Sequence, residues 1–501
     1  MATAALVLVT NFLFNSSFAV LGAILPDVAA DLGVTESTAA WSVLLPMLVA
    51  AGLQPATGMF ADMFGRKKVW LFGYAINVVS ALICGTSRSF AWLCAGRLLQ
   101  GAGASLDMPT GVAMMMEAYG RDNRGMVLAA FTASNTAGSS AGLIVGGLLA
   151  ERFGWRSLFL LPLPPVVVLL AIAVCVLRES GGGMSWKKAL AVFDWAGLLL
   201  LVLACLGMLI GVNNLASAPL LSVRVLLPVA LSVPLSAALG WVELRNEREG
   251  ATCILRPSLF TKETALALLG NCFRMATYLG LFTVIPLMLR DYYGLHAGKA
   301  AALLTVRPFV YGICSILSGK LVQTFPAAQM PLIAISTWMS IVDKFLLLLM
   351  AYTAGDSLKT ALLQILLVVQ GSANGLADTA VKTLVVQSTP PEFTANMQGV
   401  LNMSSIVSYL NGINIAVALA DSQQQGLGEH TAKPYITAAW VFLALYMVNV
   451  ALVTFLFITD GGPLGGPRRK ERRYINMVRL PTIPEEDEEE GGQRESGSES
   501  E

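Results

Sequence analysis

The sequence predicts an all-α membrane protein, and three observations lead to this fold class. Hydrophobic residues make up 55% of the 501-residue chain, and charged residues make up only 13%. A typical soluble domain has about 25% charged residues. The apolar residues also gather in about fourteen segments of roughly 20 residues, the length that a helix needs to cross a bilayer. The chain is therefore expected to cross a membrane many times and to contact lipid along its spans.

Each expected transmembrane helix is an apolar segment that few charges interrupt. The segments span residues 4–25, 38–61, 69–86, 91–117, 125–149, 157–178, 194–213, 222–243, 264–289, 298–320, 330–353, 358–386, 397–420 and 435–459. The signals at 194–213 and 222–243 are the weakest, because the connection NNLASAPLLS is itself fairly apolar. The first segment follows no basic region, so it is interpreted as a retained helix and not as a signal peptide.

Lysine and arginine are unevenly distributed between the two sets of loops that connect these segments. The richer set includes Arg66, Lys67, Lys68, Arg121 and Arg124, and the C-terminal tail on the same side adds PRRKERR. Loops rich in lysine and arginine stay in the cytoplasm. We therefore expect both termini to be cytoplasmic, which agrees with an even number of helices.

Several classes of function find no support in the sequence. A formal net charge of +1 gives no basic signature of nucleic-acid binding. The seven cysteines show no CxxC or Cys/His metal spacing, and no nucleotide-binding glycine loop or nucleophile triad stands out. The two histidines, His296 and His430, fall in outward loops and so outside any proton relay in the membrane. We expect no enzyme activity, no metal, no cofactor and no nucleic-acid partner.

The C-terminal tail, residues 461–501, differs in composition from the rest of the chain. It is rich in glycine and proline, then basic, then acidic, and it has almost no apolar residues. A segment of this kind cannot bury enough apolar surface to fold. We therefore expect the tail to be disordered, and its basic cluster could touch anionic lipid.

The connection GMFADMFGRKKVW, residues 58–70, combines glycines with opposite charges. Gly58 and Gly65 permit tight backbone geometry, and Asp62 precedes the basic Arg66 in one short loop. A plain cytoplasmic loop explains the basic residues, but it does not explain G-x-x-x-D-x-x-G-R-K as a unit. The pattern indicates a loop with a specific role.

The stretch RLLQGAGASLDMPTG, residues 97–111, places Arg97 and Asp107 inside an apolar segment. A charge at mid-bilayer costs about 2.5–3.5 kcal/mol on insertion scales, and such residues are functional candidates by default. Ten residues of helix separate the two by about 15 Å, with an angular offset of about 80°. They cannot pair on one straight helix, but both could line one wide cavity, and Pro109 could kink the helix there.

Small residues recur every four positions in the segment 125–149. The glycines of this stripe are Gly138, Gly142, Gly146 and Gly147. Small residues at this spacing let helix backbones approach closely in lipid. The stripe predicts either ordinary close packing or a hinge that biases which side of the protein opens.

Taken in order, these motifs resemble those of the major facilitator superfamily. The 58–68 loop is similar to the superfamily's signature loop between helices 2 and 3, and Arg97-x-x-Gln100-Gly101-x-Gly103-Ala104 is similar to its helix-4 motif. The helix-5 glycines resemble the antiporter motif of drug efflux members. FDWAG, residues 193–197, opens helix 7 as in the fourteen-helix drug:proton antiporter branch. The polar acidic tail resembles that of fungal multidrug and toxin efflux members.

The resemblance implies a major facilitator fold with 14 transmembrane helices in two six-helix bundles plus two inserted helices. Residues 1–180 would form the first bundle, 181–245 the inserted helices 7 and 8, 246–460 the second bundle and 461–501 the tail. The second half keeps only a faint repeat of the signature loop, GKLVQTFP, with Gly319 and Gln323 where Gly58 and Asp62 stand.

The resemblance also assigns a gate to the signature loop. In the family this loop contacts the cytoplasmic start of a second-half helix, near residues 396–398 here, and Arg66 could pair with Glu117 at the end of helix 4. The predicted gating residues are Gly58, Asp62, Gly65, Arg66 and Glu117.

Two positions depart from the family pattern. Leu143 stands where the helix-5 motif usually has a proline, and Ser17 stands where the branch often has an acidic residue on helix 1. The loss of that acid makes Asp107 the best candidate for proton exchange, with Arg97 tuning its charge. The alternative is that Asp107 is a structural carboxylate bonded to a neighbouring helix.

The other predicted pathway residues are polar or charged residues inside the spans. The whole pathway set is Arg97, Asp107, Asn15, Arg274, Arg307 and Asp378. Arg274 or Arg307 could partner Asp107 or bind an anionic substrate. Asp378 and Lys382 share a helix face and could neutralise each other, whereas the adjacent Asp343 and Lys344 are expected to point in different directions.

The function implied by the resemblance is proton-coupled efflux of small apolar compounds such as drugs, toxins or secondary metabolites, by alternating access. The partners would be a small-molecule substrate, protons and the lipid bilayer, and we expect a monomer in the plasma membrane, or else in a vacuolar or vesicular one. Two alternatives stay open: an uptake symporter or facilitator of the same fold, and a non-transporting receptor that signals through the tail.

Overall fold

The computed structural model describes residues 2–20, 24–120, 123–179, 184, 186–214, 221–291, 303–352, 356–390, 393–424 and 433–459, and regular structure in this part of the chain is helical. The elements in chain order are α1 (Ala2–Val20), α2 (Leu25–Leu32), α3 (Glu36–Ala39), α4 (Trp41–Phe64), α5 (Arg66–Gly85), α6 (Phe90–Tyr119), α7 (Arg124–Phe153), α8 (Ser157–Leu160), α9 (Leu163–Val176), α10 (Trp186–Val192), α11 (Trp195–Asn213), α12 (Val223–Arg248), η3 (Pro257–Leu259), α13 (Lys262–Asp291), α15 (Val306–Thr324), η4 (Pro326–Ala328), α16 (Gln329–Tyr352), α17 (Asp356–Gln387), α18 (Thr394–Gln424) and α19 (Lys433–Thr459).

Every expected apolar segment coincides with a helix, but two segments are interrupted where the prediction has one continuous helix. The first segment ends earlier, because α1 stops at Val20 and the short α2 begins at Leu25. The segment at 157–178 is broken into α8 and α9, where the prolines of LPLPP lack the N–H groups that a continuous helix needs. The segment at 298–320 contains α15 (Val306–Thr324), and residues 298–302 lie outside the described residues. His296, His430 and the tail from residue 461 lie outside the described residues.

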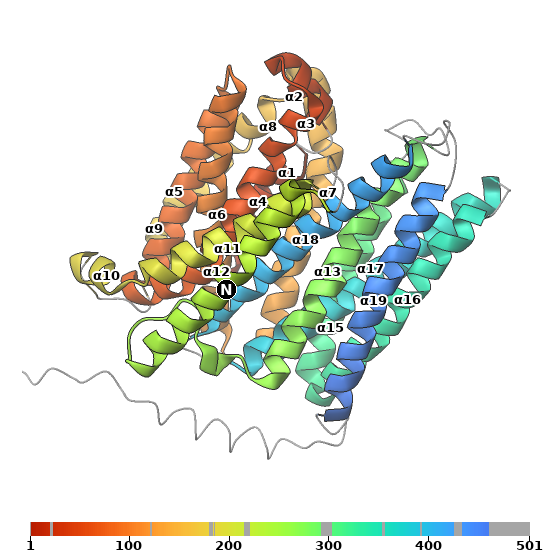
Figure 1. The fold of residues 1–501 in the computed structure, drawn as a ribbon. Helices are drawn as coiled ribbons and strands as arrows, with labels where there is room; N and C mark the ends of the chain where they lie inside the picture. Colours follow the sequence, from red (N-terminus) through yellow and green to blue (C-terminus); the bar gives the residue numbers. More distant parts are fainter. Residues whose placement is uncertain are drawn as a thin grey trace, which may run out of the picture. The chain divides into compact units, whose positions relative to one another are not determined.

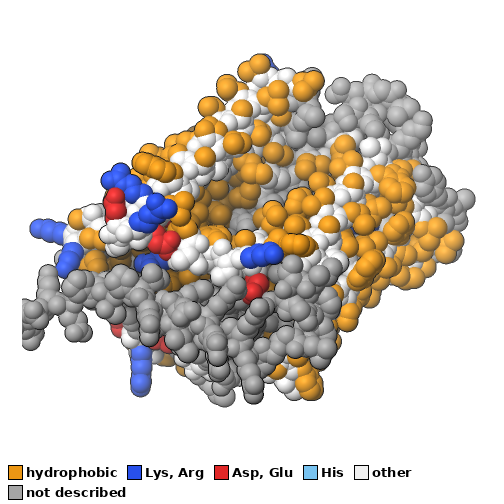
Figure 2. Space-filling model, turned by 60° about the horizontal axis from the view of Figure 1, so that its bottom comes forward, with side chains coloured by type: hydrophobic (Ala, Val, Ile, Leu, Met, Phe, Trp, Pro, Cys, Tyr) orange, Lys and Arg blue, Asp and Glu red, His pale blue; other side chains and the backbone are white. Residues whose placement is uncertain are grey.

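Nine of the described helices are long and apolar enough to cross a membrane by length and composition. Side chains on their flanks are apolar and exposed, such as Val223 at 73%, Trp241 at 63% and Trp338 at 63%. Water would make so much apolar surface unfavourable, whereas hydrocarbon makes it stable. Figure 2 shows apolar side chains along the flanks and charged ones gathered at the end that comes forward. The helices are those of an integral membrane protein.

Local sequence signals set where individual helices begin and end. The Ser89 hydroxyl caps α6 by accepting from the Trp92 N–H at 3.3 Å, and the Asp194 carboxylate caps α11 by accepting from the Gly197 N–H at 2.8 Å. Gly65 has a φ of 97° between α4 and α5, a value that favours glycine. The sharp turn of the signature loop therefore depends on Gly65.

The helices pair in a pattern that repeats between the two halves of the chain. In the first half α1 packs on α7, α4 on α6 and α5 on α6; in the second half α13 packs on α18, α15 on α17 and α16 on α17. Helices α11 and α12 form a hairpin of their own that touches α4 and α18 (Figure 1). The halves meet where α4 packs on α18 and α15 packs on α7. An internal repeat of this kind is common in secondary transporters.

An ion pair joins α2 to the short connection between α7 and α8, outside the spans. The Asp31 carboxylate lies 2.7 Å from the Arg156 guanidinium and accepts from the Trp155 indole N–H at 3.1 Å. Hydrogen bonds from Arg156 and then Trp155 hold the pKa of Asp31 below its ordinary value of 3.8. The pair therefore stabilises the fold above pH 3.8, and this contribution disappears as the pH falls through the lowered pKa.

Replacing Asp31 with asparagine should remove this acid-dependent contribution. Because the pair is exposed, we expect a loss below about 1 kcal/mol at pH 7, with wild type and variant converging as the pH falls below 3.8. Thermal melting of the detergent-purified protein across this pH range measures the difference. A gap between the two proteins that persisted or widened in acid would contradict the assignment.

Candidate functional site

The signature loop lies beside a close contact between the two halves of the chain. A Cβ atom built on Gly58 of α4 would meet the backbone of Asn396 in α18 at well under 3.0 Å. The Asn396 side-chain amide donates to the Pro55 carbonyl at 2.9 Å and to the Ile254 carbonyl at 2.7 Å. The sequence predicts a contact near residues 396–398, and the backbone makes it so close that only glycine fits at position 58.

The predicted repeat in the second half makes the corresponding contact. Gly319 of α15 packs so tightly on Gly125 and Ala129 of α7 that a Cβ at position 319 would not fit. The Gln323 amide donates to the Asn123 side chain across this contact. Beside it, the Arg124 guanidinium donates to the Val386 carbonyl at 3.1 Å. Both inter-half contacts lie at the same end of the helices, so this end is closed in the structure.

Arg66 and Glu117 lie together as the sequence predicts. Arg66 at the start of α5 donates to the Glu117 carboxylate near the end of α6 at 3.2 Å. The pair tethers the loop to the helix that carries Arg97 and Asp107. The Asp62 side chain lies outside the described residues, so its predicted partner stays a prediction.

The small-residue stripe of α7 packs against the backbone of α1. The Ser134 hydroxyl donates to the Leu8 carbonyl at 2.6 Å, and Cβ atoms built on Gly138 or Gly142 would collide with the carbonyls of Phe12 and Ser16. Gly146 is buried one turn further along, and what surrounds Gly147 lies outside the described residues. These contacts support the close-packing interpretation, and the hinge stays a prediction.

Asp107 lies inside the first half at the contact between α5 and α6. It is 3% exposed, and one carboxylate oxygen accepts from the Asn77 amide at 2.8 Å. The other oxygen has no hydrogen-bond partner within the described residues. Asn77 also lines a small, partly open cavity that Tyr74 and Gln100 share. One bond to a neutral amide therefore links a buried carboxyl group to a cavity wall.

Arg97 is buried at the other end of the same stretch and does not contact Asp107. Its Nε donates to the Ser42 carbonyl at 2.6 Å, and another nitrogen donates to Gln100. The guanidinium also lies 5.7 Å from the centre of the Phe159 ring. The separation expected from the helix geometry is thus observed. Asn15, in contrast, donates within α1, to Asn11.

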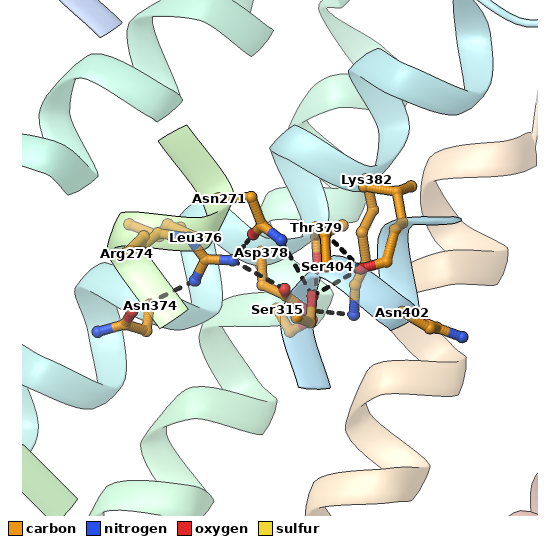
Figure 3. A network of polar contacts seen from close by, with 12 residues as sticks. Asn271, Arg274, Ser315, Asn374, Leu376, Asp378, Thr379, Lys382, Asn402 and Ser404 are labelled. Carbon is orange, nitrogen blue, oxygen red and sulfur yellow. Dashed lines mark hydrogen bonds and ion pairs between the residues drawn. The ribbon is translucent and has the colours of Figure 1, made fainter. Parts of the chain in front are cut away.

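Arg274 lies in a polar network in the second half, together with Asp378 (Figure 3). The Arg274 guanidinium of α13 is 3.0 Å from the Asp378 carboxylate of α17, and Lys382 lies 2.6 Å from the other oxygen of the same carboxylate. The prediction that Asp378 and Lys382 neutralise each other is confirmed. The expectation that Arg274 could partner Asp107 is wrong, because the two residues lie in different halves and Arg274 faces the carboxylate within its own half.

Arg307 is buried among neutral groups in the second half. It is 3% exposed, its Nε donates to the Tyr278 hydroxyl at 3.3 Å and another nitrogen donates to the Gln370 amide oxygen at 3.3 Å. Its guanidinium also faces the rings of Tyr278 and Phe282, at 4.0 Å and 4.2 Å from their centres. It does not pair with Asp107, and no carboxylate of the described residues forms an ion pair with it.

The expectation that Asp343 and Lys344 point apart is also wrong. The Lys344 ammonium lies 2.8 Å from the Asp343 carboxylate, and both side chains are about 1% exposed. It also donates to the Ser340 carbonyl at 2.7 Å and lies over the Tyr446 ring. The long flexible stem of lysine lets its ammonium turn back along the helix, so the directions of the two Cβ atoms do not decide the contact.

Neutral amides are the site residues that the sequence does not reveal. Asn77 bonds Asp107, Gln370 bonds Arg307, and Asn271 and Asn374 bond Arg274. The only signal for them is a polar side chain in an apolar segment, as Asn77 is in YAINVVS. That signal marks many positions and does not say which charge each amide contacts.

Comparison with known proteins shows which family and which relatives this chain resembles. A family model described as the Major Facilitator Superfamily matches residues 7–242 and 266–488. The methylenomycin A resistance protein of Bacillus subtilis (strain 168) is 27% identical over 461 residues, covering 90% of this chain and 93% of that protein. The cephamycin export protein CmcT of Amycolatopsis lactamdurans is 35% identical over 209 residues, covering 40% of this chain and 43% of that protein.

A solved structure shares the fold. The crystal structure of the human organic anion transporter MFSD10 (TETRAN) superposes with a TM-score of 0.62 at 14% identity, covering 90% of this chain and 98% of that chain. At this identity the likeness shows the fold alone. Both sequence relatives are bacterial, and the fungal type expected from the tail stays a prediction. The family model spans most of the chain, so this protein is a membrane transporter of the Major Facilitator Superfamily.

Proposed function

We propose that this transporter exports small, largely apolar organic compounds in exchange for protons, by alternating access. It would have 14 transmembrane helices and belong to the drug:proton antiporter branch. The observation that carries the proton-coupling part is the buried carboxyl group of Asp107, which lies 3% exposed with one amide partner. The names of the two relatives, a resistance protein and an export protein, support export as the direction.

Asp107 suits proton exchange better than the other buried carboxylates of the two six-helix halves. Asp343 is paired with one cation and Asp378 with two, which stabilises both in the charged form. Asp107 forms no ion pair among the described residues, and its one partner is neutral. A buried carboxyl group without a cation can hold a proton and release it when water reaches it. We propose the small cavity beside Asn77 as the route for that water.

The contacts between the two halves are the part of the protein that we expect to open and close during transport. The halves touch through Gly58 and Asn396, and through Gly319 and Gly125, at one end of the helices. The loops at this end include Arg66, Lys67 and Lys68, so we place it and both termini in the cytoplasm of a cell whose plasma membrane holds the protein. The structure would then be closed to the cytoplasm, and export would require these two contacts to separate and re-form.

Replacing Asp107 with asparagine tests proton coupling, because the change removes the ionisable group and keeps its shape. Sealed inside-out vesicles with a trapped pH dye and an imposed proton gradient would receive methylenomycin A, a cephamycin or ethidium in turn. We expect at least one compound to drive proton release with the wild type, and the Asp107→Asn response to fall to that of vesicles without the protein. Asp31→Asn, which removes a carboxylate outside the spans, should behave as wild type.

Two other outcomes would contradict the proposal. Equal responses of the wild type and Asp107→Asn would place the proton site elsewhere, with Asp378 as the next candidate. Movement of labelled compound without any proton signal in the wild type would indicate a facilitator or a transporter coupled to another ion.

A further inference from the structure

We propose that Arg307 binds an anionic group of the transported compound, while the aromatic rings around it contact the compound's apolar part. The inference rests on the proposed export function and names a substrate class for it: flat, largely apolar molecules that carry one carboxylate or a similar anion. Four observations support it, namely the neutral partners of Arg307, its contrast with the other buried arginines, the charge balance of the second half and the partly exposed rings.

The partners of Arg307 leave its charge without a counter-charge among the described residues. Its hydrogen bonds go to a tyrosine hydroxyl and an amide oxygen, each at 3.3 Å. Typical N–H···O bonds measure about 2.7–3.2 Å, so both are long. The rings of Tyr278 and Phe282 stabilise a cation only through their π faces. These contacts hold the guanidinium in place and provide no charged acceptor.

The other buried arginines make shorter or charged contacts. Arg274 donates to Asn271 at 2.6 Å and to the Asp378 carboxylate at 3.0 Å. Arg97 donates to a backbone carbonyl at 2.6 Å. An arginine in the interior of this protein can therefore form a short hydrogen bond or an ion pair. Arg307 differs from both, which points to a partner that comes and goes.

The described interior of the second half contains more basic than acidic side chains. The buried basic ones are Arg274, Arg307 and Lys344, and the buried acidic ones are Asp343 and Asp378, while Lys382 is 17% exposed. Asp378 faces Arg274 and Lys382, and Asp343 pairs with Lys344. Asp343 also lies within electrostatic reach of Arg307, but its ion pair is with the lysine. Buried charge in a membrane protein is normally paired or functional, and an anion at Arg307 would reduce this excess.

The rings around Arg307 provide a rim that a flat molecule can contact. Arg307 is buried, whereas Tyr278, Phe282 and Tyr409 are only partly buried. The Tyr278 ring stacks on that of Tyr311, with centres 5.9 Å apart, and Tyr409 lies within electrostatic reach of Arg307. An aromatic ligand can stack on such side chains while its carboxylate bonds to the guanidinium. Arginine is suited to this contact because its planar fork can donate two parallel hydrogen bonds to a carboxylate.

Matched pairs of acid and amide test the proposal directly. The probes are 1-naphthoate, 2-naphthoate, 4-biphenylcarboxylate and 9-anthroate, each beside its neutral carboxamide. Binding to the detergent-purified full chain would be measured by equilibrium dialysis, and export by uptake into inside-out vesicles. For the wild type we expect at least one acid to bind about 10-fold or more tightly than its amide, a difference of about 1.4 kcal/mol. Arg307→Gln should abolish this preference, and Arg307→Lys should retain part of it, since lysine keeps the charge without the fork.

Arg256→Gln is the matched control. Arg256 also lies over an aromatic ring, with its guanidinium 4.3 Å from the centre of Phe393, but in the connection between α12 and α13. The Arg256→Gln variant should keep the wild-type preference for the acid over its amide. Tyr278→Ala should weaken the acid and its amide alike, because the ring contacts the part that they share. Thermal melting checks that each variant is folded. Arg307→Lys still allows the test if Arg307→Gln does not fold.

The outcomes separate this inference from the proposed function. If no acid binds more tightly than its amide to the wild type, or if a folded Arg307 variant keeps the full preference, Arg307 is not an anion site. If the preference depends on Arg307 but no compound moves protons in the vesicles, the anion site stands and proton-coupled export fails.

Discussion

Replacing Gly58 with alanine should reduce the ratio of closed to open protein by about 5- to 150-fold and so lower the transport rate. A penalty of about 1–3 kcal/mol on the closed state implies a change of this size. The new Cβ would meet the backbone of Asn396 at well under 3.0 Å, and backbone cannot turn aside as a flexible side chain can. Forcing extra atoms into a packed contact costs about 1–3 kcal/mol, and each 1.4 kcal/mol changes an equilibrium about tenfold. The penalty applies only where α4 touches α18, so it should shift the equilibrium between open and closed states without unfolding the protein.

A disulfide across the second inter-half contact can report this shift. Asn123 and Gln323 are hydrogen-bonded across it, so the pair Asn123→Cys and Gln323→Cys should cross-link on mild oxidation when this end is closed. Adding Gly58→Ala should slow the cross-linking although the substitution lies at the other contact. Proteins with only one of the two new cysteines give the background from native thiols.

Gly312→Ala is the matched control for the Gly58 variant. Gly312 is also a helical glycine, in α15, and a Cβ built on it meets nothing within 4 Å. It should leave cross-linking and flux at wild-type values. An unchanged cross-linking rate in the Gly58 variant would mean that α18 yields easily and that the contact is no gate.

The backbone contacts of this proposed gate are predictable from the sequence because they depend on glycine spacing. Gly58 and Gly319 occupy corresponding positions in the two copies of one loop motif, and a glycine in such a position signals close backbone approach. The pairing of Arg66 with Glu117 is predictable for a similar reason. Both lie at helix ends on the same side of the membrane, where few other partners are available.

Partners across helices inside the membrane are not predictable in the same way. An apolar span that is hydrophobic all round does not reveal which face turns toward which neighbour. Thus the sequence indicates that Asp107 and Arg274 need partners, but not that these are Asn77 and Asp378. The contact between Asp343 and Lys344 depends on a side-chain rotamer, which spacing along the helix does not encode.

Replacing Asp378 with asparagine should destabilise the protein by about 3–5 kcal/mol, the usual cost of breaking a buried ion pair by removing one partner. The carboxylate is fully buried and lies 3.0 Å from Arg274 and 2.6 Å from Lys382. Removing it leaves two cations without this counter-charge inside the second half. The loss reflects the cations left behind, so a second change, Lys382→Met, should recover part of it.

Unfolding with sodium dodecyl sulfate in mixed micelles measures this loss, and an exposed pair gives the control. Arg245 and Glu249 have the same four-residue spacing as Lys382 and Asp378, with a 2.8 Å contact, but their side chains are 60% and 55% exposed. Glu249→Gln should leave the free energy of unfolding nearly unchanged, because water screens an exposed pair. If Asp378→Asn cost no more than Glu249→Gln, water or the lipid headgroups would have to screen Arg274 and Lys382. The network would then be an open polar path through the second half and not a buried support for α13 and α17.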